Sequence, residues 1–347
     1  MPTFCRHNRF IERCPICSKT LPGNAPSGAG TPRARGAARA GASGSSVRGR
    51  RVRGEAVRVH REGRAEDDGF RSPLVPGVRA SADARRLAEE IAFSSGRLLA
   101  LSVQPPGLYG EIRALAAADL ERASWMCFLT AYLCPLEGDD PFAGIRLALT
   151  RTPDGLFDPS QPPNLGDIPL GPRSSHDATR GAETLIAYRQ WVARNGRPDG
   201  AADASSGGSQ AVAFTGDPAW SPKRRFERLF ERLALPGLAR MGRYELLVML
   251  GRLGLYELLA DSAHLAGVRG LSADDPTTLA AKRVFGIGDP LLLERRAASL
   301  AQAVSVPIDT LDLALANWLL PQRATIGFPP DTIDDGAFER AAVALGV

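Results

Sequence analysis

The chain has 347 residues, of which 44% are hydrophobic and 6% aromatic, and its formal net charge is +5. This length fits one large domain or two ordinary ones, and the apolar content is sufficient for a sizeable core. A membrane-spanning protein and a disulfide scaffold are not expected, because no apolar run is long enough and only five cysteines occur.

The basic residues number 43, and almost all of them are arginine. Arginine forms bidentate contacts with phosphate groups, so its abundance favours a polyanionic partner such as DNA. A GC-rich genome also enriches arginine, alanine and glycine, and composition alone does not separate the two explanations. Since the N-terminal stretch MPTFCRHNRF has no apolar signal core, we expect a cytoplasmic, nucleoid-associated protein.

The first 21 residues carry four possible metal ligands in the spacing C-x-H-x6-C-x2-C. These ligands are Cys5, His7, Cys14 and Cys17. Three thiolates and one imidazole are a common ligand set for tetrahedral zinc, whereas scattered thiols near a terminus are the alternative. A segment this short has almost no core, so zinc binding would supply its folding free energy. Four protein ligands leave no open position, and we therefore expect a structural zinc site in residues 1–21.

Residues 22–80 are rich in glycine, alanine, serine, proline and arginine and show no apolar periodicity. Such a segment cannot bury enough surface to offset its chain entropy, so a disordered basic linker is predicted. Its arginines could follow DNA phosphates without sequence preference, or the segment could be a plain solvated tether.

Residues 81–347 are predicted to form one all-α domain, because amphipathic helices follow one another without alternating strands. Helix starts are expected where a side-chain acceptor stands at the cap position, often directly before a proline. The predicted caps are Ser81, Asp119, Ser221, Asp275 and Asp289. A proline-rich loop is predicted between about residues 150 and 176, and a Gly/Ser-rich loop between about residues 195 and 213.

A short glycine turn joins two of these helices in the stretch VFGIGDP. Gly286 and Gly288 tolerate positive φ and leave backbone N–H groups uncovered, and the next helix points its positive end at the turn. The turn, with Lys282 and Arg283 just before it, could therefore hold one phosphate of a DNA backbone, with a monovalent cation between them. Many helix–helix turns need glycine, so this pattern alone does not indicate DNA binding.

About twenty residues after the turn, an Ile-Asp-Thr sequence at 308–310 stands at the start of another helix. Together with the turn, this arrangement resembles the helix-hairpin-helix DNA glycosylase superfamily over about residues 277–318 and, more weakly, from residue 119. The resemblance implies a helical glycosylase-like domain with a catalytic aspartate at Asp309 and with Asp312 as the alternative. The segments RVFGIGD and SWMCFLTAYLCPLEGDDPF are also similar to the alpha-glutamyl/putrescinyl thymine pyrophosphorylases.

The chain departs from the superfamily in two respects. Bifunctional members carry a lysine nucleophile after the hairpin, where this chain has Asp289-Pro290-Leu291, and the four-cysteine iron–sulfur loop of some members is absent. A lyase reaction through an imine is therefore not expected. The resemblance implies a monofunctional glycosylase that excises a modified base, for example from hypermodified phage DNA. The alternatives are a transferase that attaches an amine to activated hydroxymethyluracil in DNA, and a non-catalytic DNA-binding module.

Base excision passes through a transition state with oxocarbenium character, which a nearby carboxylate stabilises. Asp309 suits this role, although Asp309 with Asp312 three residues later is also a good capping arrangement, and both can hold. A base pocket needs apolar or aromatic walls and a few polar groups. The candidates for it are Trp125, Tyr132, Glu137 and Trp318. Core packing is the alternative for the aromatic residues, and a solvated turn is the alternative for Glu137.

Overall fold

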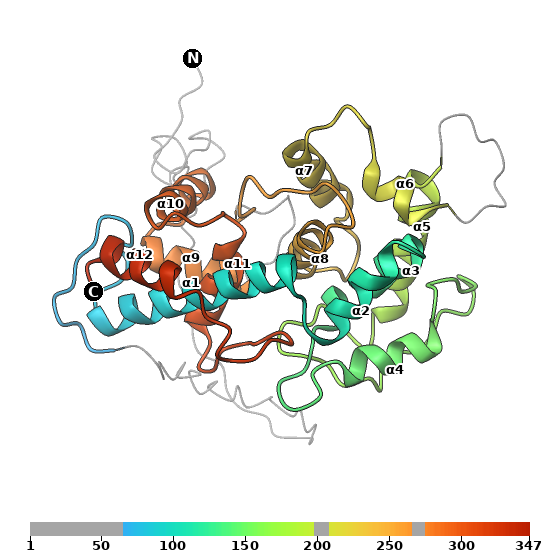
Figure 1. The fold of residues 1–347 in the computed structure, drawn as a ribbon, viewed down its shortest axis with the longest axis horizontal. Helices are drawn as coiled ribbons and strands as arrows, with labels where there is room; N and C mark the ends of the chain where they lie inside the picture. Colours follow the sequence, from blue (N-terminus) through green and yellow to red (C-terminus); the bar gives the residue numbers. More distant parts are fainter. Residues whose placement is uncertain (1–64, 198–207, 266–274) are drawn as a thin grey trace, which may run out of the picture. The chain divides into compact units, whose positions relative to one another are not determined.

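The computed structural model describes residues 65–197, 208–265 and 275–347, and the statements below concern these ranges. They contain twelve α-helices and no β-strand, so the all-α fold class is confirmed (Figure 1). None of the helices in these ranges combines the length and the apolar content that a membrane crossing requires. The helices are α1 (Ser81–Val103), α2 (Gly107–Ala116), α3 (Leu120–Leu133), α4 (Ala143–Arg151), α5 (Gly181–Asn195), α6 (Gln210–Thr215), α7 (Pro222–Arg232), α8 (Arg240–Arg252), α9 (Pro276–Phe285), α10 (Pro290–Ala303), α11 (Thr310–Leu319) and α12 (Asp335–Leu345).

Four of the predicted caps are confirmed by their hydrogen bonds. The backbone N–H three positions later donates to the side chains of Asp119, Ser221, Asp275 and Asp289, at 2.9, 3.3, 2.8 and 3.0 Å respectively. The prediction for Ser81 is wrong, because α1 begins at Ser81 itself and its N-cap is Ala80. Asp68, from the preceding segment, accepts the backbone N–H of Ser81 at 3.0 Å and so satisfies this helix start.

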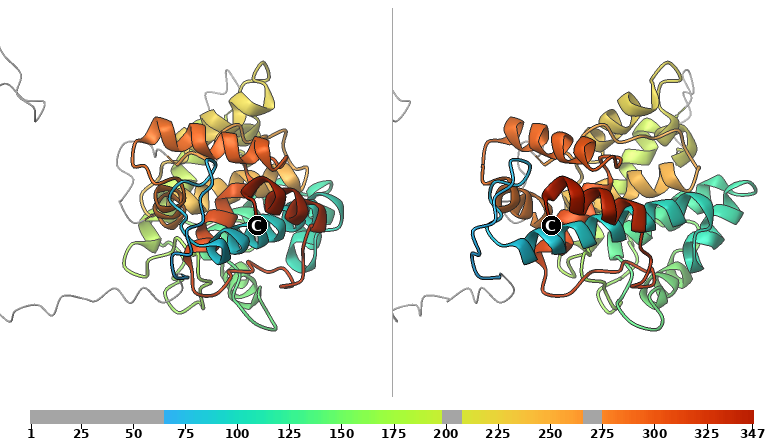
Figure 2. Two further views of the ribbon diagram at one scale, coloured as in Figure 1. Left: turned by 90° about the vertical axis from the view of Figure 1, so that its left-hand side faces the viewer. Right: turned by 60° about the vertical axis from the view of Figure 1, so that its left-hand side comes forward.

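The apolar core divides into two clusters, one built mainly from α2, α3 and α5–α8 and the other from α9, α10, α12 and the first half of α1. Figure 1 shows α9, α10 and α12 on the left of the view and α3 to α6 on the right. Figure 2 shows the same helices from two further directions. Helix α11 contributes Leu313 to the first cluster and Leu311 to the second. Ile308, just before α11, packs against both, so the start of α11 lies at the boundary between them.

The helical domain begins earlier than predicted. Residues 65–80 were expected to belong to the linker, yet Val75 and Val78 are fully buried in the second cluster. The Gly77 N–H donates to the Val284 carbonyl at 2.9 Å, and a Cβ on Gly77 would lie only 1.8 Å from the Arg283 carbonyl oxygen. This segment is therefore part of the domain. The rest of the predicted linker and the proposed zinc ligands Cys5, His7, Cys14 and Cys17 lie outside the described residues.

The predicted pair of helices around the glycine turn is present as α9 and α10. Gly286 ends α9 in the left-handed conformation with φ +63°, where glycine is favoured. Asp289 then caps α10. The assignment of the whole domain to the helix-hairpin-helix glycosylase fold stays a prediction.

The proline-rich loop between α4 and α5 crosses the end of α3. The Gly171 N–H lies 3.1 Å from the Leu133 carbonyl oxygen, and the Ser175 N–H donates to the Tyr132 carbonyl at 2.9 Å. A Cβ on Gly171 would lie 1.9 Å from the Pro135 carbonyl oxygen, so only glycine permits this crossing. The crossing places Arg173, which is 6% exposed, inside the domain.

Candidate functional site

Asp309 stands directly before α11, at the boundary between the two apolar clusters. It is 4% exposed and makes no capping hydrogen bond, so the predicted capping arrangement is wrong. Instead Arg252, at the end of α8, binds both carboxylate oxygens: Nε donates to Oδ2 at 3.0 Å and Nη2 to Oδ1 at 2.8 Å. This bidentate contact matches the fork geometry of arginine and fixes the orientation of the carboxylate.

Asp312, in the first turn of α11, is shared by two arginines. Arg173 donates from Nη2 to Oδ2 at 2.7 Å, and Arg240 donates from Nη1 to Oδ1 at 2.5 Å. Burial alone would raise the pKa of this carboxyl group, but Arg240 and Arg173 outweigh burial and hold the pKa of Asp312 below its usual value. Asp312 is therefore ionised at neutral pH.

Arg240 connects α8 to its neighbours on several sides. Its Nε donates to the backbone oxygen of His264 at 3.1 Å, and its guanidinium lies 5.1 Å from the ring centroid of Tyr244. Asp275, the cap of α9, lies 3.8 Å from Nη1. Burial disfavours the charged form, yet Asp312 and Asp275 raise the pKa of Arg240 above its usual value. Arg240 is thus a permanent cation at the start of α8 that faces the cap of α9 and the first turn of α11.

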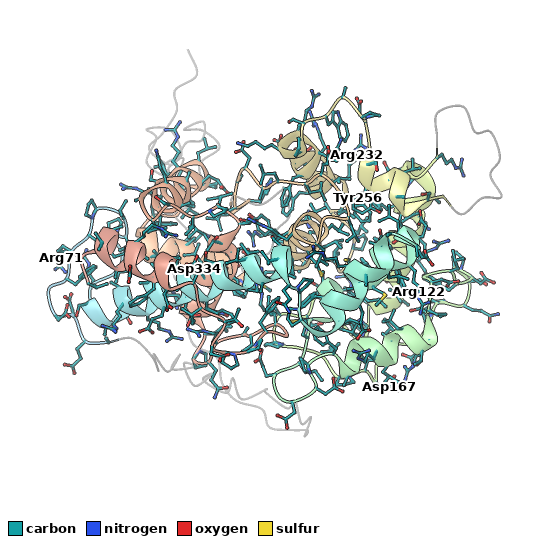
Figure 3. All side chains as sticks on the ribbon, viewed as in Figure 1. Arg71, Arg122, Asp167, Arg232, Tyr256 and Asp334 are labelled. Carbon is teal, nitrogen blue, oxygen red and sulfur yellow. The ribbon has the colours of Figure 1, made fainter. Side chains whose placement is uncertain are left out.

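A second buried ion pair joins α1 to α8. Arg97 Nη1 lies 2.7 Å from Glu245 Oε1, and these side chains are 2% and 15% exposed. We use the name arginine network for Arg97, Arg173, Arg240, Arg252, Glu245, Asp309 and Asp312. Most other ion pairs lie at the surface, as does the labelled Asp167 that pairs with Arg151 (Figure 3). Removing charges from water costs several kcal/mol per ion, so a buried cluster of this kind is more typical of a functional site than of a stabilising core.

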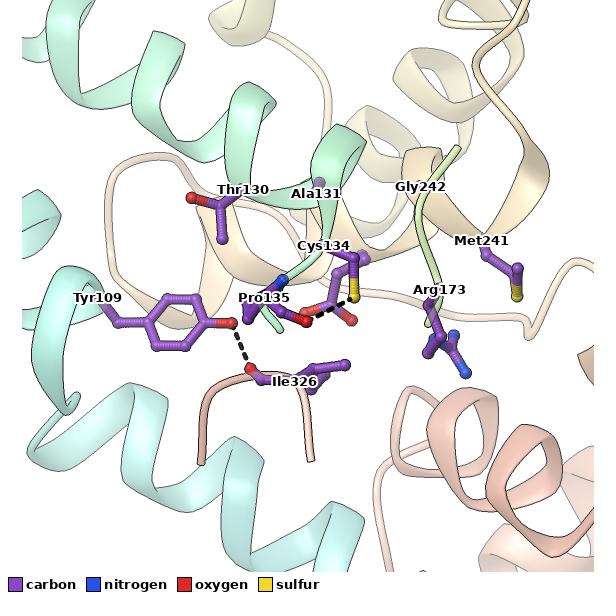
Figure 4. A pocket seen from close by; sticks show the side chains of 10 residues that line it. Tyr109, Thr130, Ala131, Cys134, Pro135, Arg173, Met241, Gly242 and Ile326 are labelled. Carbon is purple, nitrogen blue, oxygen red and sulfur yellow. Dashed lines mark hydrogen bonds between the residues drawn. The ribbon is translucent and has the colours of Figure 1, made fainter. Parts of the chain in front are cut away.

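A small pocket opens beside the arginine network (Figure 4). Its lining residues are Tyr109, Thr130, Ala131, Cys134, Pro135, Arg173, Met241, Gly242, Glu245 and Ile326. The cavity volume is about 10 Å³, which is room for roughly one water molecule. Arg173 and Glu245 bring opposite charges to it. In this closed form the pocket does not hold a nucleobase.

Backbone strain occurs in the wall of this pocket. Cys134 ends α3 with φ +59° and ψ 137°, a conformation that a residue with a side chain rarely adopts. Its thiol is buried, and burial raises the pKa of Cys134 to about 12, so the thiol is neutral. Strained residues of this kind cluster at functional sites, where surrounding contacts hold them in place.

The residues predicted to contact DNA lie together at the turn between α9 and α10. Gly286 and Gly288 are exposed, and a Cβ on Gly288 would meet only open space. Arg283 is exposed and Lys282 is half-buried, so both basic side chains reach the surface beside the turn. The geometry leaves the backbone of the turn open to a phosphate. A monovalent cation at the turn stays a prediction.

The four residues predicted for a base pocket are not brought together. Trp125 and Tyr132 are fully buried in the first apolar cluster, whereas Trp318 belongs to the second. Each aromatic side chain already has a polar partner: Trp125 Nε1 donates to the Thr152 carbonyl at 2.6 Å, the Tyr132 hydroxyl lies 2.9 Å from His176 Nδ1, and Trp318 Nε1 donates to the Asp83 carbonyl at 2.9 Å.

Glu137 lies apart from the three aromatic residues, in the exposed turn after α3. It accepts the backbone N–H of Thr325 at 2.8 Å and the Thr325 hydroxyl at 2.7 Å. It also lines an open surface pocket of about 620 Å³ with its neighbours Asp139 and Asp140. The Glu137 carboxylate therefore holds Thr325, in the loop after α11, through two hydrogen bonds.

Sequence reasoning does not single out Arg173, Arg240 or Arg252, although they make the closest contacts to Asp309 and Asp312. One local signal exists. Helix α8 reads RMGRYELLVMLGR, in which arginines interrupt and bound an apolar helix. Arginine is almost never fully buried unless it is paired, so arginines in a helix of this kind predict buried carboxylate partners. The identity of those partners depends on the fold.

The arrangement favours stabilisation of negative charge. Guanidinium groups beside a pocket stabilise charge that develops on a substrate oxygen. Arginines bind both oxygens of Asp309 and both oxygens of Asp312, so each carboxylate is held in one orientation and its negative charge is compensated. The aspartates hold the arginines in place, and among these arginines Arg173 lines the pocket.

Comparison with known protein families matches residues 174–325 to the family described as alpha-glutamyl/putrescinyl thymine pyrophosphorylase clade 3. The matched segment is less than half of the chain. It runs from the loop before α5 to the loop after α11 and so contains Arg240, Arg252, Asp309 and Asp312. No curated protein and no solved structure matches the chain. The match supports the resemblance to the pyrophosphorylase group, and the glycosylase superfamily is not confirmed.

Proposed function

We propose that the protein is an enzyme that acts on a modified thymine base in DNA and replaces an activated pyrophosphate group on that base with an amine. The observation that carries this proposal is that the segment matching the pyrophosphorylase family contains α8 and α11, which supply most of the arginine network. Sequence similarity and the chemistry of the site therefore support the same reaction.

The proposed reaction is a substitution at the methylene carbon of activated hydroxymethyluracil. The amine nitrogen forms a bond to this carbon, the carbon–oxygen bond to pyrophosphate breaks, and the amine loses a proton to solvent or to a nearby base. Negative charge grows on the departing oxygen, and buried guanidinium groups stabilise such charge strongly. Arg173, which lines the pocket, is the side chain that we propose to contact the departing oxygen, and Arg240 and Arg252 are proposed to add positive charge to the site.

Asp309 and Asp312, the predicted catalytic residues, are proposed to act as positioning residues. Each binds arginine through both oxygens, which fixes the guanidinium groups before substrate arrives. Preorganised charges need no reorganisation during the reaction, and this is a main source of rate enhancement in enzymes. The same contacts argue against base excision, because a carboxylate already held by Arg252 is poorly placed to stabilise an oxocarbenium ion. We therefore propose amine transfer in preference to the glycosylase reaction.

DNA is the proposed macromolecular substrate. The open backbone at Gly286 and Gly288, with Lys282 and Arg283 beside it, is proposed to contact a backbone phosphate. A base in a duplex cannot reach a buried site, so the enzyme would have to extrude the modified base and widen the pocket beside Arg173. The zinc site at Cys5, His7, Cys14 and Cys17 is proposed to be structural.

Mass spectrometry of nucleosides and free bases tests the proposed reaction. The full-length protein is incubated with amines and with DNA that carries pyrophosphorylated hydroxymethyluracil. The expected product is an amine-bearing base still attached to its sugar, together with free pyrophosphate. Release of free base would instead select the glycosylase reaction, and binding without any product would select a non-catalytic DNA-binding module.

Two variants connect the outcome to the site. Arg252→Lys keeps a positive charge but loses the bidentate contact with Asp309, so we expect at least a tenfold loss of amine transfer. Arg224→Lys is the matched control, because Arg224 is an exposed arginine of α7 outside the network. Equal activity of both variants would contradict the proposed role of Arg252.

A further inference from the structure

Two buried polar atoms without partners lie close together in the segment before α5. Arg173 Nη1 and Ser175 Oγ are both buried and make no hydrogen bond. Buried polar groups in folded proteins are nearly always paired, so an unpaired group needs an explanation such as a bound ligand or an ordered water. Two such groups two residues apart point to something that binds there.

Arg173 has one donor nitrogen to spare. Its Nη2 donates to Asp312 at 2.7 Å, while Nη1 has no partner. The side chain is 6% exposed and lines the small pocket (Figure 4). A guanidinium group has five N–H donors and no acceptor, so the missing partner must be an acceptor. Because the arginine is charged, an anionic oxygen is the strongest acceptor for it.

Ser175 lies directly behind Gly242, a residue that lines the same pocket. A Cβ on Gly242, which lines the pocket, would be only 2.5 Å from Ser175 Oγ. Glycine at position 242 therefore leaves just enough room for this hydroxyl group, which packs against the Gly242 backbone. Arg173 thus brings an unused donor into the pocket, and the unused hydroxyl of Ser175 lies next to it.

The loop that carries these donors is held firmly. Ser174 Oγ donates to the Tyr132 carbonyl at 3.1 Å, and the Ser175 N–H donates to the same oxygen at 2.9 Å. Cys134, in its strained conformation, also lines the pocket. A loop fixed in this way presents its donors without a large cost in conformational entropy when a ligand binds.

We propose that Arg173 and Ser175 form the subsite for the pyrophosphate group that leaves the base, an inference that rests on the proposed function. The cavity of about 10 Å³ accommodates roughly one oxygen atom, so a terminal oxygen of the anion enters it and the rest of the group lies at its mouth. Glu245 also lines the pocket, but Arg97 binds it at 2.7 Å and compensates its charge.

Isothermal titration calorimetry of the full-length protein with inorganic pyrophosphate tests this subsite. We expect Arg173→Lys to weaken binding roughly 10- to 100-fold, because one ammonium group cannot serve Asp312 and the anion together. Ser175→Ala removes an unpaired buried hydroxyl, so it should fold at least as well as the wild type and still bind roughly tenfold more weakly. Arg225→Lys is the matched control, since Arg225 is 5% exposed and lies on α7, away from the pocket.

Three results would overturn the subsite. The first is wild-type protein that binds no pyrophosphate, and the second is binding that is equal in Arg173→Lys, Ser175→Ala and the wild type. The third is binding of inorganic phosphate and of an unmodified DNA duplex with the same dependence on Arg173, because the subsite would then hold a backbone phosphate. If the second result is found and Arg173→Lys also transfers amine, the proposed function stands and only the subsite is overturned. Pyrophosphate binding that depends on Arg173, without amine transfer to any DNA, would support the subsite and contradict the proposed function.

Discussion

Asp309 and Arg252 form an ion pair in which each charge compensates the other. The Asp309 side chain is 5% exposed and that of Arg252 is 24% exposed. Removing one member leaves a charge without its partner, whereas removing both leaves an apolar contact. We expect Arg252→Met to lower the free energy of unfolding by about 3 kcal/mol, and the combination with Asp309→Leu to restore most of it. Urea unfolding of the single and double variants measures both effects.

The surface pair of Arg151 and Asp167 supplies the control for this cycle. Its distance is 2.5 Å, but the Asp167 side chain is 65% exposed. Exposed pairs contribute about 0–1 kcal/mol, so Arg151→Met should change the free energy of unfolding by less than about 1 kcal/mol. A double variant Arg252→Met/Asp309→Leu as unstable as Arg252→Met alone would contradict the interpretation of the buried pair. Amine transfer should stay lost even where stability returns.

His264 adds a dependence of stability on pH. Its ring stacks on Phe230 at 4.0 Å, and burial, together with Arg240 and Arg243, lowers the pKa of His264 to about 4. The unfolded chain therefore takes up this proton first as the pH falls. The free energy of unfolding should drop between about pH 6.5 and pH 4, by up to about 3 kcal/mol.

Substitution of His264 by asparagine isolates this contribution. His264 has φ +51°, which asparagine tolerates better than most residues. We expect the variant to lose the part of the pH dependence that lies between about pH 6.5 and pH 4, as measured by urea unfolding at several pH values. An identical pH profile in the variant would show that this histidine is protonated equally in the folded and unfolded states.

The turn between α9 and α10 contains two glycines, Gly286 and Gly288, whose substitution by alanine should have different effects on stability. Gly286 has φ +63° and a Cβ there would approach Gly77 at 3.4 Å, so Gly286→Ala should cost about 1–2 kcal/mol of stability. Gly288 faces open space, and Gly288→Ala should leave stability within about 0.5 kcal/mol. If the turn approaches a DNA phosphate, Gly288→Ala should still weaken DNA binding, as fluorescence anisotropy at fixed salt would measure. If Gly288→Ala bound DNA as tightly as the wild type, the turn would not contact DNA.

Elements were predictable from sequence where their signals are local. The caps Asp119, Ser221, Asp275 and Asp289 each act on a backbone group three residues later, so a short pattern identifies them. Asp309 has the same local pattern and does not cap, because Arg252, 57 positions earlier in the chain, binds its carboxylate instead. Arg173 and Asp312 are 139 positions apart. Contacts of that range depend on how distant segments come together in the fold, which no local pattern encodes.

At the scale of the whole molecule, the boundary of the helical domain depends on two valines. Val75 is fully buried against the second apolar cluster, although its surrounding sequence reads as linker. Val75→Ala should lower the free energy of unfolding by about 2 kcal/mol in urea unfolding of the full-length chain, because two buried methyl groups are lost. Val103→Ala is the control, since Val103 is 67% exposed and should change stability by less than about 0.5 kcal/mol. If Val75→Ala and Val103→Ala changed the free energy of unfolding equally, residues 65–80 would belong to the linker and not to the helical domain.

The crossing of Gly171 over the end of α3 provides a signature for recognising relatives. The sequence GPRSSH at 171–176 contains the glycine that permits the crossing, the arginine that reaches Asp312 and the serine beside Gly242. Any larger residue at position 171 would collide with the Pro135 carbonyl. A homologue that has an arginine at position 173 but lacks this glycine must route the loop differently and cannot deliver the guanidinium to the same place. In reconstructed ancestral sequences we therefore expect amine transfer only where glycine at position 171 and arginine at position 173 are both present.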